Sequence, residues 1–170
     1  TIDFDGTVGA TTAVGGNFII GTNTTTANVD LADAVSVDGL ISITGANVTI
    51  GGAVRADANS AGNEALTISA TNTAASDLNV NNILTTNTGA ITLSAKDDII
   101  FAAAGDLASN NGNVLVTADS DNTAAGSGGA LTMADGTTIN AGSGTITMSA
   151  DENIALGGLT TTNATGAAVA

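Results

Sequence analysis

Apolar and polar residues alternate in short segments that recur along the whole chain. A period of two residues predicts β-strands with one buried face. Alignment of the strongest segments gives six pairs of inward-facing residues: Phe18/Ile20, Ile41/Ile43, Leu66/Ile68, Ile91/Leu93, Val114/Val116 and Ile146/Met148. The first members of successive pairs are 23, 25, 25, 23 and 32 residues apart. This spacing is the length of one coil of a three-sided β-helix, so each pair is expected to begin a coil.

Two further segments follow the first one in each coil. The second inward pairs are Val29/Leu31, Val48/Ile50, Leu78/Val80, Ile99/Phe101, Leu131/Met133 and Ile154/Leu156. A shorter third segment is expected around Val35/Val37, Val54, Ile83, Leu107, Ile139 and Leu159. Small residues stand two positions beyond the first inward pairs, at Gly45, Ala70, Ala95, Ala118 and Ala150. They predict a tight corner over a narrow core.

A longer repeat of about fifty residues is superimposed on the coils. Related seven-residue segments begin at Gly39, Gly89 and Gly144, and an Asn-Thr motif lies between them. The connection after the first strand also alternates between long and short, with the long ones at 21–28, 69–77 and 117–130. Self-similarity at a fixed period is typical of a stacked solenoid.

The sequence therefore predicts an all-β fold, a right-handed parallel β-helix of six to seven coils of about 23–25 residues, paired into units of about 50 residues. The right hand follows from the general preference of parallel crossover connections. Residues 1–170 are expected to form a single β-solenoid segment in which 1–14 are a partial coil. We expect it to be part of a longer repetitive chain or a filament subunit; a complete processed subunit is the alternative.

Composition agrees with a narrow, layered core. Hydrophobic residues make up 43% of the chain and the mean hydropathy is +0.33, which argues against disorder. There are three Phe and no Trp, Tyr or Pro. The lack of Pro leaves every strand free to pair on both edges. Cys is absent too, so disulfides contribute nothing to stability.

Charge excludes several classes of partner. The formal net charge is −14, from 16 acidic residues against only Arg55 and Lys96. A nucleic-acid backbone or an anionic lipid surface would be repelled over most of the molecule. No apolar run approaches the ~20 residues that span a bilayer, so membrane insertion is not expected.

The residue types needed for most catalysis are missing. The chain has no His and no Cys, which removes the usual bases and one common nucleophile. Parallel β-helix enzymes that act on acidic polysaccharides place several basic residues in a groove, and two isolated cations do not supply that set. We therefore expect a protein that is not an enzyme, and catalytic residues are not assigned.

Clustered carboxylates suggest a calcium site. Paired acids occur at Asp3/Asp5, Asp97/Asp98, Asp119/Asp121 and Asp151/Glu152. The best local set is Asp119, Asp121 and Asn122 in the longest loop, because Ca²⁺ prefers six to eight oxygen ligands. The alternative is that these are solvated turn acids that keep an apolar rod soluble. No other cofactor is expected.

Threonine-rich stretches raise one further possibility. Ice-binding solenoids carry a regular Thr-x-Thr on one face in every coil, but here the row is broken near Val54 and Leu107. Ordinary outward-facing Thr ladders are the simpler explanation.

The segments 89–101 and 144–158 carry the closest likeness to a known family. Gly-x-Ile-x-Leu-Ser-Ala followed by Asp-Asp-Ile-Ile-Phe, and its variant with Glu-Asn-Ile-Ala-Leu-Gly-Gly, resembles the coils of filamentous-haemagglutinin-like exoproteins and other giant bacterial surface adhesins. The resemblance covers nearly the whole chain. It implies a right-handed parallel β-helix in a secreted or cell-surface filament, hence an extracellular location.

These observations favour a structural component of an extracellular filament or surface adhesin, a rigid solenoid that mediates assembly or cell-surface and cell–cell attachment. Its expected partners are itself or flanking repeats, joined end to end through exposed coil edges, and a cell-surface or glycan ligand. The expected interaction ridge comprises Thr22, Asn23, Thr24, Thr71, Asn72, Thr73, Asp121, Asn122 and Thr123. Alternatives are a calcium-dependent binding or assembly module and, less favoured, a polysaccharide-acting β-helix enzyme or an ice-binding solenoid.

Overall fold

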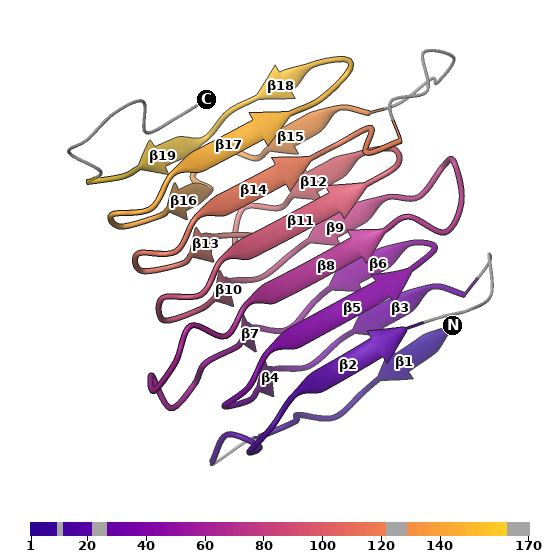
Figure 1. Cartoon of the computed structure of the whole chain (residues 1–170). Coiled ribbons are helices and arrows are strands. Elements are labelled where there is room, and N and C mark those ends of the chain that lie inside the picture. The colour runs from indigo at the N-terminus through magenta and orange to yellow at the C-terminus, as the bar shows by residue number, and fades with distance from the viewer. Residues whose placement is uncertain (10–11, 22–26, 122–128, 163–170) are drawn as a thin grey trace.

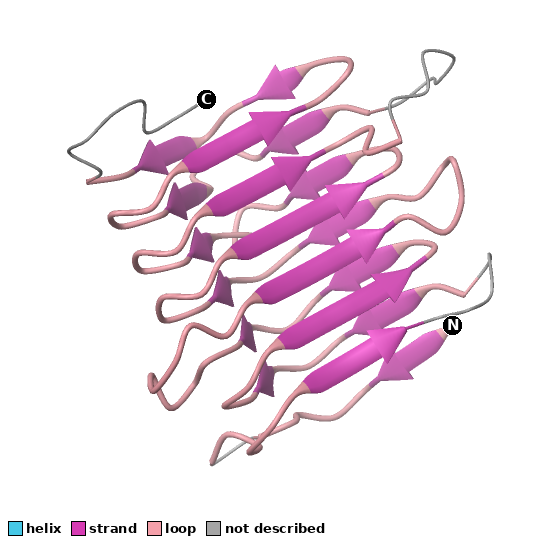
Figure 2. Cartoon of the chain, viewed as in Figure 1, coloured by secondary structure: helices cyan, strands magenta, loops and turns pink. Residues whose placement is uncertain are grey.

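The computed structural model describes residues 1–9, 12–21, 27–121 and 129–162. Within them the chain has 19 strands and no helix, and the strands form three parallel sheets of seven, six and six strands. Figure 2 shows strands joined only by loops and turns. The all-β parallel β-helix predicted from the sequence is confirmed.

Each complete coil contributes one strand to each sheet, in a fixed order. The first sheet contains β2 (Phe18–Gly21), β5 (Ile41–Gly45), β8 (Leu66–Ala70), β11 (Ile91–Ala95), β14 (Val114–Thr117) and β17 (Ile146–Ser149). The second contains β1 (Ile2–Phe4), β3 (Val29–Leu31), β6 (Val48–Ile50), β9 (Leu78–Val80), β12 (Ile99–Phe101), β15 (Leu131–Met133) and β18 (Ile154–Ala155). The third contains β4 (Val35–Ser36), β7 (Val54–Arg55), β10 (Leu84–Thr85), β13 (Leu107–Ala108), β16 (Thr138–Asn140) and β19 (Gly158–Thr160).

The coils rise from the indigo end of Figure 1 to the yellow end. Strands of the first sheet run to the right in front, and strands of the second sheet return to the left behind them as the chain climbs. A path that turns this way while rising is right-handed. Below the six complete coils, β1 pairs with β3, and isolated bridges join Val8 to Val35 and Val14 to Val37.

The six first-strand pairs predicted from the sequence lie in one continuous register. Phe18 stands against Ile41, and this column continues through Leu66, Ile91, Val114 and Ile146. The four middle members of that column are at most 1% exposed. Neighbouring parallel strands lie about 4.8 Å apart, so each inward side chain packs on its equivalents above and below. The core is therefore a set of parallel columns of Ile, Leu and Val.

One inward residue was wrong by a single position. The sequence analysis placed Ile83 in the third segment, but Ile83 is 36% exposed and Leu84 is fully buried. Leu84 stands in register with Val54 and Leu107. Two adjacent apolar residues leave the alternation ambiguous, and a shift of one residue exchanges the two faces of a strand. The Asn82 side chain adds a bond between coils in this register, since its amide nitrogen donates to the Gly51 carbonyl at 3.0 Å.

The last predicted second-strand pair is also not part of the buried core. Ile154 and Leu156 are 42% and 53% exposed. Ile154 keeps the expected register against Leu131 below it. Among the described residues, however, no strand of the second sheet lies above β18. Without that neighbour the inward position at this level is open to solvent.

A column of glycines runs along the corner between the third and first sheets. Gly39, Gly89, Gly112 and Gly144 each stand two positions before a strand of the first sheet. A Cβ added to Gly112 would overlap the Gly89 carbonyl, and one added to Gly144 would overlap the Gly112 carbonyl. The coils approach here so closely that a side chain has no room. Glu64 occupies the equivalent position before β8 and interrupts the column.

Hydrogen bonds from backbone N–H groups to side chains also join the coils, at the corner before the second sheet. Each Asn or Asp there accepts the backbone N–H of the equivalent residue one coil higher. The hydrogen bonds run from Asn47 N to Asn28 Oδ1 (3.2 Å), Asp77 N to Asn47 Oδ1 (2.8 Å), Asp98 N to Asp77 Oδ1 (3.2 Å) and Ala130 N to Asp98 Oδ1 (2.9 Å). We call these residues the Asx ladder. It stabilises the stack because it satisfies a corner amide in four successive coils.

Candidate functional site

Acidic residues gather where the upper coils turn from the first sheet to the second. This acidic corner contains seven of the 16 acidic residues of the chain: Asp77, Asp97, Asp98, Asp119, Asp121, Asp151 and Glu152. They fall on one edge because each lies in the connection between a first and a second strand of its coil, and the coils are stacked in register. The corner is the most strongly charged feature of the fold.

Three of these carboxylates converge. One oxygen from each of Asp77, Asp97 and Asp98 lies within 4.8 Å of the other two. Backbone hydrogen bonds hold the three side chains in place: Asp77 and Asp98 belong to the Asx ladder, and Asp97 Oδ1 accepts the Gly129 N–H at 3.0 Å. All three residues are half-buried. A set of carboxylate oxygens at this separation suits a hard divalent cation.

Repulsion within this trio changes the acidity of Asp97. Burial raises the pKa of its carboxyl above the ordinary Asp value, and the charges of Asp98 and Asp77 raise it further. Hydrogen bonding from Gly129 opposes these effects in part. The native fold therefore holds the Asp97 proton more tightly than the unfolded chain does.

The raised pKa predicts how Asp97→Asn changes stability. Stability contributed by a raised carboxyl pKa is fully present below the ordinary Asp value and is lost as the pH rises through the raised value. Asparagine keeps an oxygen for the Gly129 N–H and removes the charge. Without divalent cations, we expect this variant to be more stable than the native protein at neutral pH by about 0.5 kcal/mol, a gain that vanishes in acid.

Urea denaturation at a series of pH values measures this difference. Asp135→Asn is the matched control because Asp135 is exposed on another loop. A gain for Asp97→Asn that stays constant from neutral to acidic pH would contradict the assignment of the repulsion to Asp97.

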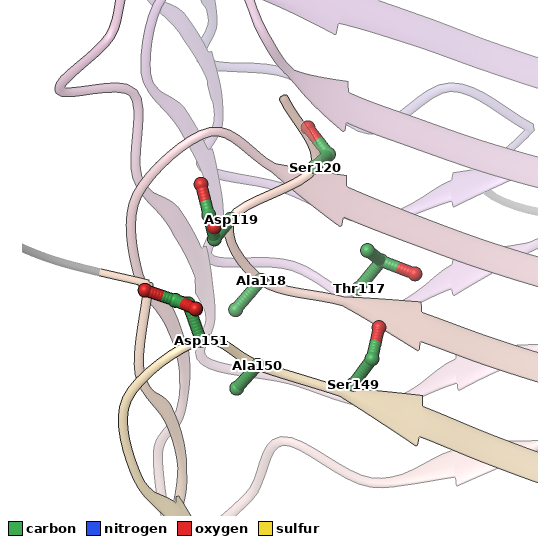
Figure 3. A pocket seen from close by; sticks show the side chains of 7 residues that line it. All are labelled: Thr117, Ala118, Asp119, Ser120, Ser149, Ala150 and Asp151. Carbon is green, nitrogen blue, oxygen red and sulfur yellow. The ribbon is translucent and has the colours of Figure 1, made fainter. Parts of the chain in front are cut away.

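Next to the trio, the corner contains an open hollow of about 290 Å³ between the last two complete coils, which begin with β14 and β17. It is lined by Thr117, Ala118, Asp119, Ser120, Ser149, Ala150 and Asp151. Figure 3 shows the side chains of Asp119 and Asp151 where the two coils turn, and those of Thr117 and Ser149 one above the other at the strand ends. Asp119 has a positive φ of 53° and its N–H donates to the Asp97 carbonyl at 3.3 Å. The backbone of one residue that lines the hollow is thus hydrogen-bonded to the backbone of one residue of the trio.

Of the residues predicted to bind calcium, Asp119 and Asp121 lie in this corner, but neither belongs to the converging trio. Asp121 pairs with Lys96 at 3.8 Å, and Asp119 lines the hollow. Asn122 lies outside the described residues. The structure instead brings Asp77 next to the Asp97/Asp98 pair. Calcium binding by Asp119, Asp121 and Asn122 remains a prediction.

The predicted interaction ridge is described only in part. Thr22, Asn23, Thr24, Asn122 and Thr123 lie outside the described residues, so the stacking of the three long loops stays a prediction. The described loop that follows β8 turns tightly. The N–H groups of Thr71 and Asn72 both donate to the Gly45 carbonyl, at 3.1 and 3.3 Å, and the hydroxyls of Thr73 and Ser76 lie 2.8 Å apart.

Sequence reasoning missed Asp77, although the signal was present. Asp77 and Asp98 each stand immediately before a second strand whose alignment was predicted correctly, Leu78 against Ile99. Extending that alignment backward by one residue places Asp77 below Asp98. The sequence pattern indicated acids that are close together along the chain, whereas Asp77 reaches Asp97 and Asp98 from the coil below.

Comparison of the chain with protein-family models, with curated proteins and with solved structures finds no match. In the described part of the chain, no helix has the length and apolar character needed to cross a membrane.

Proposed function

We propose that the chain is a rigid structural segment of an extracellular filament or surface adhesin, and that it mediates assembly or attachment. The observation that carries the proposal is the unbroken register of three parallel sheets from coil to coil. Every interior strand exchanges backbone hydrogen bonds with a parallel neighbour on each side, so bending or twisting the stack strains many hydrogen bonds together. A rod of this kind suits a mechanical or spacing role.

The two ends of the described stack support assembly through coil edges. At the upper end, β17, β18 and β19 each have a sheet neighbour on one side only, and Ile154 and Leu156 are exposed there. At the lower end, Phe4 and Phe18 pack edge-to-face with ring centroids 5.6 Å apart, partly buried at the margin of the core. Unpaired edges with apolar residues favour pairing with further coils, supplied by flanking repeats or by another copy.

The outer face offers a polar surface for lateral contact. Thr67 and Thr92 stand in register on the first sheet, as do Ser69 and Ser94, whose hydroxyls are 3.1 Å apart. Rows of hydroxyl groups suit hydrogen bonding to another filament, a cell surface or a glycan. This surface and the loop at Thr71–Ala75 are where we place attachment.

Electron microscopy of the purified chain tests the proposal. If coil edges join end to end, we expect unbranched rods much longer than the roughly 30 Å that its own coils span, and they should persist in EDTA. Addition of separately purified chain should lengthen existing rods at their tips. Rods that never exceed the length of one molecule at any concentration would count against self-assembly and leave flanking repeats as the only end partner.

A calcium-dependent assembly module is the second candidate, and the convergence of Asp77, Asp97 and Asp98 favours it. A cation bound only by the native fold raises its stability by mass action. At ten times the dissociation constant we expect a melting temperature higher by about 3–6 °C. Asp98→Asn keeps the hydrogen bond to the Ala130 N–H and should lose most of that increase. An equal increase in both proteins would exclude the trio as the cause.

A further inference from the structure

The connection between β7 and β8 differs from its counterparts. It spans ten residues, 56–65, whereas the four other connections from the third to the first sheet span four or five. In Figure 1 it projects at the lower left, on the edge of the solenoid opposite the acidic corner. It also contains the position at which Glu64 interrupts the glycine column. The extra residues therefore change the one corner where the coils otherwise approach most closely.

Two carboxylates in this loop have oxygens that are buried and have no hydrogen-bond partner. Asp57 is completely buried, and its Oδ2 contacts no donor. Glu64 is half-buried, and its Oε2 is likewise a buried atom without a hydrogen-bond partner. A buried polar atom without a partner is uncommon in folded proteins, and a buried carboxylate without compensation carries a large desolvation cost. Two in one ten-residue loop point to a shared ligand.

Both carboxylates lie against the same glycine. The Gly62 N–H donates to Asp57 Oδ1 at 3.4 Å, and a Cβ on Gly62 would overlap the carboxyl group of Glu64. Gly62 thus lies between two acidic residues of the loop in sequence and touches the carboxyl group of each, which a residue with a side chain could not do on the Glu64 side.

No cationic side chain compensates these charges among the described residues. The Arg55 guanidinium donates to the Ala58 carbonyl at 3.1 Å and forms no ion pair with either carboxylate. Lys96 is paired with Asp121 at the opposite corner. The positive charge that the loop requires is therefore not supplied by the described part of this chain.

The loop is held in shape by its own hydrogen bonds. Asp57 and Ser60 adopt positive φ angles of 53° and 57°, and the Ser60 N–H donates to the Asp57 carbonyl at 3.1 Å. The Ala61 N–H donates to Asn59 Oδ1 at 2.9 Å, and the Thr88 hydroxyl donates to the Gly62 carbonyl at 2.8 Å. Asp57 therefore has its position set before any ligand arrives.

From these observations we propose that the loop 56–65 binds a hard divalent cation, Ca²⁺, between the carboxylates of Asp57 and Glu64. Water molecules and backbone carbonyls complete the oxygen shell that Ca²⁺ requires. The cation neutralises the buried charge and fastens the corner at which the glycine column is broken. This site is separate from the acidic corner and does not depend on the proposed role in filaments.

Hydrogen–deuterium exchange with mass spectrometry locates the effect and works for single chains and filaments alike. With CaCl₂ added to the native chain, we expect exchange of the amides at 58–62 to slow about tenfold or more, because a bound cation raises the cost of local opening. Asp57→Asn and Glu64→Gln should each abolish this protection, whereas Asp135→Asn should retain it. Peptides that cover the acidic corner report separately on any protection there.

Two results would overturn the proposal. One is unchanged exchange at 58–62 in native protein at saturating CaCl₂, which is expected if an ordered water or a proton shared by the two carboxylates satisfies the buried oxygens. The other is full protection in the Glu64→Gln variant. If Asp57→Asn does not fold, the native protein and Glu64→Gln still decide the outcome.

Discussion

Replacing Leu93 by alanine is expected to lower the free energy of unfolding by about 3–4 kcal/mol. Leu93 is fully buried in the middle of the first sheet, in register with Ile68 below and Val116 above. Alanine would leave a gap in a column whose neighbours are fixed by backbone hydrogen bonds on both sides and cannot collapse into it. We expect the melting temperature to fall by about 10 °C.

Leu115→Ala provides a matched control for this prediction. The same side chain is removed one coil higher in the same sheet, but Leu115 points outward and is 40% exposed. We expect it to cost less than about 1 kcal/mol. Chemical denaturation of both variants, compared with the native protein, measures the two values. Equal losses would mean that the inner and outer faces of the first sheet are wrongly assigned.

Gly112→Ala is expected to destabilise the fold by about 2–4 kcal/mol even though it adds a single methyl group. The new Cβ would overlap the carbonyl oxygen of Gly89 in the coil below. Because that atom belongs to the backbone, relief requires the two coils to separate at this corner. Such a separation stretches the hydrogen bonds between β11 and β14, for example from the Ile91 N–H to the Asn113 carbonyl at 2.9 Å.

The control for this variant is Gly21→Ala. Gly21 ends β2 and does not adopt a positive φ, and no atom of the described residues lies within 4 Å of a Cβ added to it. Alanine there should be neutral or slightly stabilising, since it restricts the unfolded chain. Thermal unfolding followed by circular dichroism distinguishes the two. A Gly112→Ala variant as stable as Gly21→Ala would mean that the coils are not in close contact along the glycine column.

The sequence was sufficient to predict the strands of each coil, but not every register or which coil lies at the end of the described stack. Alternation identified the inward residues of the first strands because one face of each is buried on its neighbours. It failed at Ile83 and Leu84, where two adjacent apolar residues fit either register. It also placed Ile154 and Leu156 in a core, because a periodic pattern does not reveal which coil lacks a covering neighbour.

Interactions between coils were harder to predict than the coils themselves. The sequence pointed to paired acids, but Asp77 joins Asp97 and Asp98 only through stacking across coils. Glu64 and Asp57 gave no signal at all. Their significance comes from buried oxygens without partners, and burial of individual atoms depends on the path of a loop that periodicity does not specify.

The Asx ladder stops at Ala130, and this has a consequence for the behaviour of the molecule under tension. The Ala130 N–H donates to Asp98 Oδ1, but the methyl side chain of Ala130 cannot accept a hydrogen bond from the coil above. On their other side the last two complete coils are still joined by a side chain, because the Thr145 N–H donates to Asn113 Oδ1 at 3.0 Å. A force that pulls the upper coil away from the stack should therefore separate it first at β18, where backbone hydrogen bonds have no side-chain hydrogen bond of the Asx ladder beside them. The coils below keep the Asx ladder at this corner and should separate only at a higher force.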